Sequence, residues 1–198
     1  LFVPVHEIPD LKWKELGKHI SNVIKLSSEE TIIASIPVFD FKAPQVITTV
    51  SKHGMIKRSE LKDFEVQRYS KPMTCMKLKA GDELVAVSNS SHSEIFLTTK
   101  LGYALWYGID EVPITGVKAG GVKAMTLKNA EIVGAHLFDG SIEYLTVFTE
   151  KNTAKRIKLS EFDKTTRARR GIQIVRDVKT NPYYIRNTFM ITTKDELG

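Results

Sequence analysis

The residues best suited to bind a ligand are Lys and Arg side chains that gather in one part of the chain. Residues 151–170 hold eight Lys or Arg and two acidic residues, a local charge of +6. The whole chain of 198 residues also has a formal charge of +6, so the remainder is close to neutral. A basic excess confined to one segment predicts an anion-binding surface, because a cationic patch concentrates negatively charged ligands. A solvated basic face that serves only solubility is the alternative.

Side chains that catalyse reactions or hold metals are not grouped in this sequence. The histidines are scattered, with no Cys or carboxylate at metal-ligand spacing: His6, His19, His53, His92 and His136. The run Gly120-Gly121-Val122-Lys123 lacks the spacing of a phosphate-binding loop, and no G-x-S-x-G motif occurs. We therefore predict that this segment has no catalytic residue, metal site or cofactor, and takes no small-molecule substrate.

Four single residues are interpreted as structural. Cys75, the only cysteine, lies between Met73 and Met76 in an apolar run and is expected to be a buried filler in a reducing compartment. His136 lies in an apolar run and is expected to be a hydrogen-bonded core residue rather than a ligand. Trp13 and Trp106 are expected to pack in the core or between repeats, with stacking on single-stranded bases as the alternative.

The chain repeats itself with a period of about 50 residues. Blocks at 5–8, 61–64, 109–112 and 159–162 share the order apolar, polar, acidic, apolar, and they start 56, 48 and 50 residues apart. The recurring acids are expected to accept hydrogen bonds from loop N–H groups: Glu7, Asp63, Glu111 and Glu161. Before the last three blocks, β-rich runs reverse at turns that contain Gly or Asn, which predicts hairpins at 46–58, 95–106 and 144–157.

Two further apolar runs follow each block and complete about four strands per unit. The first set lies at 20–26, 73–78, 122–127 and 172–175, and the second at 31–36, 83–87, 131–137 and 184–191. Units of this size predict propeller-type blades in an all-β fold, since no window sustains a helical period. We expect one domain over 1–198, with blades at 1–38 (partial), 39–90, 91–139 and 140–191. Residues 192–198 form a loop or begin another unit.

A basic loop follows each block, and equivalent loops of a circular array are expected to lie around one rim. The candidate DNA-binding residues are Lys12, Lys14, Lys18, Arg68, Lys71, Lys118, Lys123, Lys155, Arg156, Lys164, Arg167, Arg169 and Arg170. A curved cationic rim suits the phosphates of double-stranded DNA, because neutralising them releases counterions. Glycines such as Gly120, Gly121 and Gly171 are expected to let the main chain approach the ligand closely.

Such a rim is expected to read little sequence and to favour DNA that bends easily. We expect the replacement of Arg167, Arg169 and Arg170 with Ala to weaken DNA binding and to leave the fold intact. A propeller that binds acidic proteins or an ATPase subunit is the alternative, and plain duplex DNA would not compete with such partners.

Several runs resemble the C-terminal region of the A subunits of bacterial type IIA topoisomerases, and in particular topoisomerase IV of the Gram-positive type. They are residues 1–19 with W-K-E-L-G at 13–17, Gly54-Met55-Ile56-Lys57-Arg58, Ala119-Gly120-Gly121-Val122-Lys123 and Arg169-Arg170-Gly171-Ile172. The resemblance extends over nearly all of the chain. It implies a β-pinwheel, a disc whose blades exchange strands, with an outer rim that binds and bends DNA.

The resemblance also implies the setting of this domain. The whole enzyme is an A2B2 tetramer, in which a homodimer of A subunits and the ATPase B subunits pass one duplex through another with ATP and Mg²⁺. This segment selects DNA for decatenation and supercoil relaxation. The cleaving tyrosine and the metal-binding acids lie outside the segment. The location implied is cytoplasmic and chromosome-associated, with peripheral membrane attachment also open.

Gyrase A subunits share the fold and use it to wrap DNA, which is the alternative within the family. Their signature Q-R-R-G-G-K-G is absent from this sequence. The nearest matches are Gln67-Arg68-Tyr69 and Arg169-Arg170-Gly171. This departure disfavours strong chiral wrapping of DNA, and the match at residues 13–17 favours topoisomerase IV over gyrase.

Overall fold

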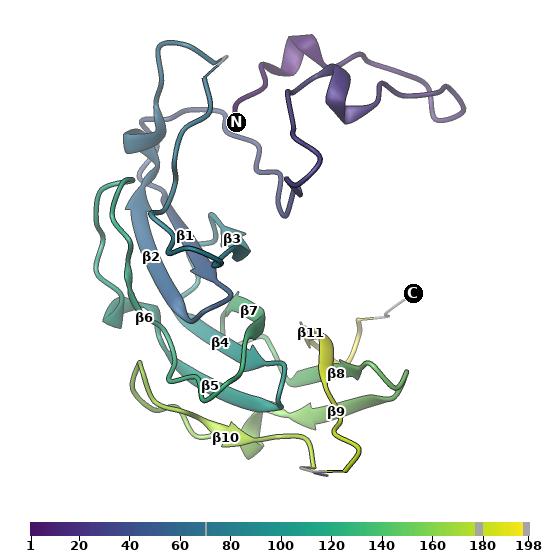
Figure 1. Cartoon of the computed structure of the whole chain (residues 1–198), viewed down its shortest axis with the longest axis vertical. Helices are drawn as coiled ribbons and strands as arrows, with labels where there is room; N and C mark the ends of the chain where they lie inside the picture. The colour runs from purple at the N-terminus through teal and green to yellow at the C-terminus, as the bar shows by residue number, and fades with distance from the viewer. Residues whose placement is uncertain (70, 177–179, 196–198) are drawn as a thin grey trace.

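Three antiparallel sheets follow one another around an arc in the computed structural model, which describes residues 1–69, 71–176 and 180–195 (Figure 1). The three predicted hairpins form the centres of these sheets. They are β1 (Val46–Ser51) with β2 (Met55–Glu60), β4 (Glu94–Thr99) with β5 (Tyr103–Gly108), and β8 (Tyr144–Thr149) with β9 (Ala154–Lys158). The described residues contain no α-helix, so the predicted all-β fold is confirmed. No helix in these ranges is long and apolar enough to cross a membrane.

The acidic blocks form short 3-10 turns at which the chain leaves each sheet. The turns are η1 (Val5–Glu7), η3 (Leu61–Phe64), η4 (Ile109–Glu111) and η5 (Leu159–Glu161). A further turn, η2 (Ile20–Asn22), lies in the N-terminal segment. Each hairpin reverses at a residue with positive φ, namely Gly54, Gly102 and Asn152, because tight turns need a conformation that Gly and Asn adopt readily.

An inner strand returns to pair with the first strand of its own hairpin in all three sheets. These strands are β3 (Leu84–Ser88) on β1, β7 (Ile132–Phe138) on β4, and β11 (Ile185–Ile191) on β8. They correspond to the predicted runs 83–87, 131–137 and 184–191, which are confirmed as strands. They lie toward the concave side of the arc (Figure 1).

Two short outer strands cross to the hairpin of the preceding repeat. The strand β6 (Val122–Lys123) comes from the third repeat and pairs with β2 of the second. In the same way β10 (Ile172–Gln173) of the fourth repeat pairs with β5 of the third. The resulting orders are β3-β1-β2-β6 and β10-β5-β4-β7, while the last sheet is β11-β8-β9. Neighbouring blades therefore exchange strands, as a β-pinwheel requires.

The glycines that precede the outer strands make this exchange possible. A Cβ on Gly121 would collide with the carbonyl oxygen of Ile56, and a Cβ on Gly171 with that of Ala104. Both glycines also have positive φ, +78° and +79°. We expected these residues to bring the main chain close to a phosphate. The structure instead shows that they bring it close to the neighbouring hairpin.

The strands predicted at 20–26, 31–36 and 73–78 are wrong, because the structure has no strand in these ranges. The exchange pattern gives the reason. An inner strand needs the hairpin of its own repeat, and an outer strand needs the hairpin of the repeat before. The described residues contain no hairpin ahead of the first block, so the run at 31–36 has no ladder to join among them. The run at 73–78 belongs to the second repeat and lacks the same partner.

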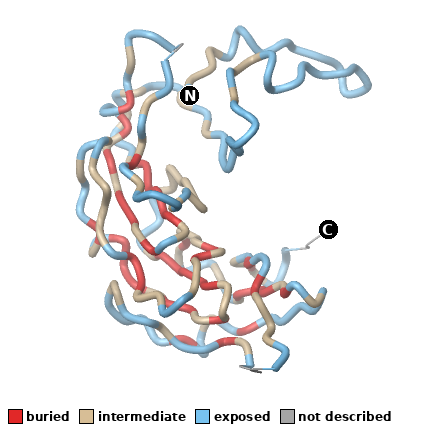
Figure 2. The backbone as a smooth tube through the Cα atoms, viewed as in Figure 1, coloured by how far each residue is buried: buried red, intermediate tan, exposed pale blue. Residues whose placement is uncertain are grey.

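Three apolar clusters form the core, and Figure 2 shows the buried stretches running through the hairpins. Residues 1–45 are mostly exposed. Trp13 is 99% exposed, so its predicted packing is wrong. Trp106 is half-buried against Phe138, with ring centroids 5.6 Å apart, which confirms its packing role. Cys75 is half-buried and packs on the smallest cluster.

Candidate nucleic-acid interface

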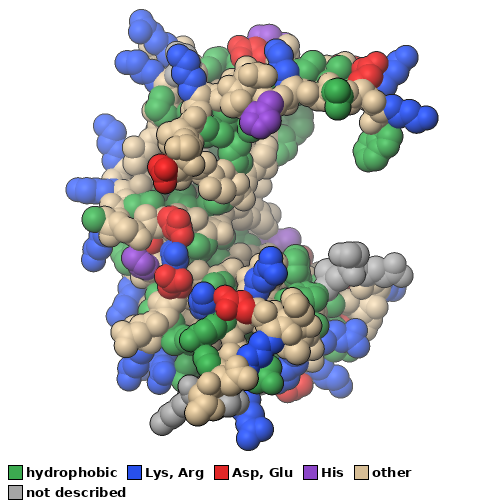
Figure 3. Space-filling model, turned by 45° about the vertical axis from the view of Figure 1, so that its right-hand side comes forward, with side chains coloured by type: hydrophobic (Ala, Val, Ile, Leu, Met, Phe, Trp, Pro, Cys, Tyr) green, Lys and Arg blue, Asp and Glu red, His purple; other side chains and the backbone are tan. Residues whose placement is uncertain are grey.

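The basic loops that follow η4 and η5 lie on the convex side of the arc, and the loop that follows η3 extends from the upper end of the arc (Figure 1). Figure 3 shows Lys and Arg side chains along this outer edge from top to bottom. Residues 9–19 belong instead to the N-terminal segment, which extends away from the sheets (Figure 1). Their cations Lys12, Lys14 and Lys18 are exposed but do not continue the edge formed by the other loops.

The loop after η5 is fastened to the preceding repeat by Arg167. Its backbone N–H donates to Oε2 of Glu111 at 2.7 Å, and its Nε donates to the carbonyl oxygen of Glu111 at 3.1 Å. A terminal guanidinium nitrogen also donates to the carbonyl oxygen of Lys123 at 2.6 Å. The donors of Arg167 are thus directed at the protein, which departs from the phosphate contact that we expected of this residue.

Thr126 adds a second attachment next to the first. Its N–H donates to the carbonyl oxygen of Arg169 at 2.9 Å, and its hydroxyl donates to the carbonyl oxygen of Ala168 at 2.7 Å. Ala168 donates in turn to the carbonyl oxygen of Ala124 at 3.1 Å. This loop is therefore held by backbone and side-chain bonds on both sides of Arg167.

Arg169 and Arg170 remain exposed at the end of this fastened loop. The guanidinium of Arg170 lies 4.1 Å from the centroid of the Tyr103 ring, a stacking that orients the group and leaves its edge accessible. Nε of Arg169 donates to the hydroxyl of Thr166 at 3.2 Å. No acidic side chain within the described ranges pairs with either arginine. A planar guanidinium presented in this way matches the oxygens of a phosphate.

Lys164 is paired with an acid in the same region. Its Nζ lies 2.7 Å from Oε1 of Glu94, whose Oε2 accepts a hydrogen bond from the Trp106 indole at 2.8 Å. The pair fastens the start of the loop to β4. Lys164 therefore adds little unneutralised charge to the surface.

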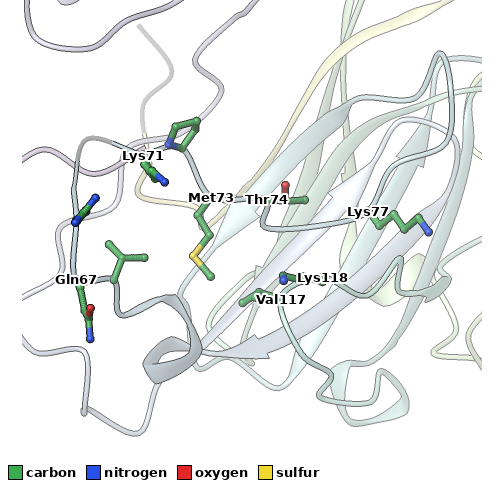
Figure 4. A pocket seen from close by; sticks show the side chains of 10 residues that line it. Gln67, Lys71, Met73, Thr74, Lys77, Val117 and Lys118 are labelled. Atoms are coloured by element: carbon green, nitrogen blue, oxygen red, sulfur yellow. The ribbon is translucent and has the colours of Figure 1, made fainter.

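A surface cleft of about 760 Å³ lies between the loop after η3 and the loop after η4 (Figure 4). Its cationic lining consists of Arg68, Lys71, Lys77 and Lys118. Figure 4 shows the side chain of Met73 pointing toward Val117 and Lys118, so the floor is partly apolar. Lys77 is not among the residues predicted from the sequence, because it lies in an apolar run interpreted as a strand. Its alternation with Met76 and Leu78 was the available signal.

Basic side chains of the first hairpin form hydrogen bonds between repeats. Lys57 is 1% exposed, and its Nζ donates to the carbonyl oxygens of Gly116 at 3.2 Å and Val117 at 2.6 Å. Burial lowers the pKa of this amine. Arg58 donates to the carbonyl oxygens of Ile109 and Val112 at 3.1 and 3.2 Å. Both side chains therefore bind the main chain of the following repeat.

Lys155 and Arg156 occupy the same positions in the last hairpin as Lys57 and Arg58 do in the first. They are exposed on β9, whose outer edge pairs with no strand of the described residues. Arg156 stacks on the Tyr144 ring at 4.5 Å, and Nζ of Lys155 donates to the carbonyl oxygen of Ile174 at 3.2 Å. These two candidates lie on a strand edge rather than in a loop.

The recurring acids do not share one role. Glu111 accepts the N–H of Arg167, so the expectation that this acid binds a loop N–H is confirmed. No hydrogen bond reaches the carboxylates of Glu7, Asp63 or Glu161 from the parts of the chain that the structure describes. The expectation is therefore wrong for these three.

His136 is a satisfied interior residue, as predicted. Its Nε2 lies 2.8 Å from the Thr188 hydroxyl, which is 3.1 Å from the Thr98 hydroxyl. Burial lowers the pKa of His136 from 6.5 to about 4, because the charged ring would lose its hydration, while the bond to Thr188 opposes this shift. The neutral ring therefore bridges the inner strands β7 and β11.

We expect this histidine to make the domain sensitive to acid. Its folded pKa lies below the unfolded value of 6.5, so the unfolded state binds the extra proton between pH 6.5 and about 4. The free energy of unfolding should be undiminished by this group above pH 6.5. It should fall by up to about 3 kcal/mol as the pH drops through that window. Urea unfolding of the parent and of His136→Asn at several pH values checks this, and equal pH dependence in the two would contradict it.

Within the described ranges, no three His, Cys, Asp or Glu side chains are grouped so that they could hold a metal ion. Besides the cleft on the basic loops, a second cleft of about 550 Å³ lies beside Trp106 and Phe162. The features that stand out chemically are therefore the cations of the convex loops.

Successive sheets of four, four and three strands, exchanged outer strands and an arc-shaped arrangement define a propeller-type repeat domain. The family comparison is consistent with this architecture. The chain belongs to the DNA gyrase C-terminal domain, beta-propeller family, whose model matches residues 3–38, 45–91, 93–139 and 143–187.

Individual proteins identify the branch of the family. The chain is 40% identical over 186 residues to the A subunit of DNA topoisomerase 4 from Bacillus subtilis (strain 168), a match that covers 93% of this chain and 23% of that protein. It is also similar to the crystal structure of the C-terminal domain of DNA topoisomerase IV. That match has a TM-score of 0.91 and 44% identity, and covers 96% of this chain and 59% of the other. The chain thus spans about a quarter of the length of its curated relative.

The gyrase A C-terminal domain is a more distant neighbour. Its structure gives a TM-score of 0.72 at 20% identity, covering 90% of this chain and 59% of the other. This likeness concerns the fold alone. The expected resemblance to the C-terminal domain of the topoisomerase IV A subunit is confirmed by these relatives.

Proposed function

We propose that the chain binds duplex DNA along the convex edge of the arc and bends it, as the non-catalytic DNA-selecting part of a topoisomerase IV. The observation that carries the proposal is the fastened loop after η5, which presents Arg169 and Arg170 without acidic partners among the described residues. Lys118, Lys123, Arg68, Lys71 and Lys77 extend the cationic surface along the same edge. Lys155 and Arg156 lie on the open edge of β9 and are left outside this surface, because Lys57 and Arg58 at the same positions of the first hairpin bind main-chain carbonyls.

The surface favours backbone contacts over base readout. Its cations stand on short loops, and the described residues contain no α-helix that could enter the major groove. Contacts of this kind position DNA and carry little sequence information. Because the loops follow a curve, DNA that contacts all of them must bend, which favours sequences or topologies that bend at low cost. A crossing or a supercoiled segment offers such DNA.

The full enzyme supplies the remaining functions in this proposal. The rest of the A subunit forms the homodimer and cleaves DNA, and the ATPase B subunit completes an A2B2 tetramer that uses ATP and Mg²⁺. This domain would then direct decatenation and supercoil relaxation toward suitable DNA in a cytoplasmic, chromosome-associated enzyme. Six tyrosines are assigned no cleaving role: Tyr69, Tyr103, Tyr107, Tyr144, Tyr183 and Tyr184. Tyr107 is fully buried, for example.

Binding of duplex DNA across a salt series tests the proposal. With about five phosphate contacts, the plot of log affinity against log salt should have a slope of about −4 to −5. Small DNA circles should bind more tightly than linear DNA of the same sequence, because their bending is already present. A flat salt response would contradict the proposal. Binding of an acidic protein that duplex DNA fails to displace would favour a protein-interaction propeller instead.

A further inference from the structure

Different side chains make the hydrogen bonds between neighbouring repeats at the two junctions, although the backbones of the junctions correspond. At the junction between the second and third repeats, Lys57 binds the carbonyl oxygens of Gly116 and Val117. At the next junction the position of Lys57 is occupied by the apolar Leu105, and the position of Val117 by Arg167. Val117 packs on the apolar cluster around Ile47, whereas Arg167 bonds to Glu111 and Lys123. The polar side chain that attaches one repeat to the next is therefore on the hairpin at the first junction and in the basic loop at the second.

This placement puts Glu111 and Arg167 directly beside the exposed arginines. Glu111 holds the backbone N–H of Arg167 from its side chain and the guanidinium from its carbonyl oxygen. The next two residues along the chain carry the bonds to Ala124 and Thr126, and Arg170 follows. Because its donors are bonded to carbonyl oxygens, Arg167 fixes the position of the loop, and the neighbouring arginines supply the accessible charge.

We propose that Glu111 and Arg167 form a clasp that positions the Arg169-Arg170 pair for DNA. Glu111 is the positioning residue and touches no DNA. This inference rests on the proposed function and names a residue that charge alone would never suggest. A fixed loop binds more tightly because less conformational freedom is lost when the complex forms.

For Glu111→Ala, the clasp and simple electrostatics predict opposite changes in DNA affinity. Replacing Glu111 with Ala removes a negative charge near the cationic edge, so long-range attraction alone would tighten DNA binding. The clasp predicts about tenfold weaker binding instead, because the two arginines must be ordered at the time of binding. Glu161→Ala is the matched control: it removes the equivalent acid of the next repeat, which is exposed and accepts no hydrogen bond within the described ranges. It should bind as tightly as the parent or more tightly.

Arg167→Lys supplies a second variant that keeps the charge. A lysine lacks the planar fork that reaches two carbonyl oxygens at once, so binding should again weaken about severalfold. If Arg167 instead contacted phosphate only as a charge, Arg167→Lys would retain most of the affinity. Urea midpoints of all variants, measured beside the parent, show that the fold is retained.

Trypsin gives a readout that does not depend on DNA. Cleavage after Arg169 and Arg170 should be about tenfold faster in Glu111→Ala than in the parent and in Glu161→Ala, because a released loop fits the protease more often. Unchanged cleavage and unchanged or tighter DNA binding in Glu111→Ala would overturn the clasp. Failure of the parent chain to bind DNA would remove the proposed function and this inference together, whereas the cleavage rates would still report whether the loop is fastened.

Discussion

Gly171→Ala should destabilise the domain by about 3 kcal/mol or more, which is one of the two largest effects expected here. A Cβ at this position meets the backbone carbonyl of Ala104, which no side-chain rotation can relieve. The φ of +79° adds the strain of a left-handed conformation, about 1–2 kcal/mol for a residue with a Cβ. The strand β10 and the bond from Ile174 to the carbonyl oxygen of Gly102 at 2.8 Å would be displaced.

Two other glycines separate the causes of this effect. Gly81 has a φ of +76° and open space around its Cα, so Gly81→Ala should show the conformational strain alone. Gly140 has neither a positive φ nor a neighbour within 4 Å, so Gly140→Ala should be nearly neutral. Urea unfolding of the three variants measures the series. Equal destabilisation in Gly171→Ala and Gly81→Ala would show that β10 shifts without cost and would refute the close approach.

Gly171 also shows why the sequence predicted the positions of the hairpins better than it predicted which strands pair with one another. Alternation of apolar residues and a turn at Gly54, Gly102 or Asn152 are local properties, and they were enough to place the three hairpins. Which hairpin an outer strand joins depends on residues far away in the sequence: Val122 pairs with Ile56, and Ile172 pairs with Ala104. Gly121 and Gly171 stand out in the sequence as small residues, but the carbonyl groups that they approach belong to another repeat.

The candidate site was predictable in location and less so in the role of each residue. Repetition placed the basic loops at equivalent positions of each blade, and the structure brings the loops after η4 and η5 to one edge, with the loop after η3 at the upper end of the arc. Arg167 and Lys164 resemble available charges in the sequence, yet they bond to Glu111 and Glu94, which lie 56 and 70 residues earlier. A composition count treats every cation alike, because it contains no information on which cations have partners in the fold.

The N-terminal cations illustrate the limit of repeat equivalence. Lys12, Lys14 and Lys18 stand at the correct distance from their acidic block, but the described residues contain no hairpin of the first repeat to orient them. An equivalent sequence position becomes an equivalent spatial position only when the surrounding strands form.

The simultaneous replacement of Arg169 and Arg170 with Ala should weaken DNA binding by about 10- to 100-fold at moderate salt, the largest effect expected on affinity. Both side chains are exposed and lack acidic partners within the described ranges, so each can neutralise a phosphate. Loss of two phosphate contacts should also make the salt slope shallower by about 2, since each contact contributes about 0.9. Arg167 stays in place in this variant because its bonds hold the loop.

The paired change of Lys155 and Arg156 to Ala is the matched control, because it removes the same charge from β9. These residues correspond to Lys57 and Arg58, which bind main-chain carbonyls rather than a ligand. Net charge falls equally in both variants, so a difference between them isolates the position of the charge from its amount. Fluorescence anisotropy with duplex DNA across a salt series measures both affinity and slope. If the two variants lose affinity and slope to the same extent, DNA responds only to the overall charge of the chain, and the loop after η5 is not a specific contact surface.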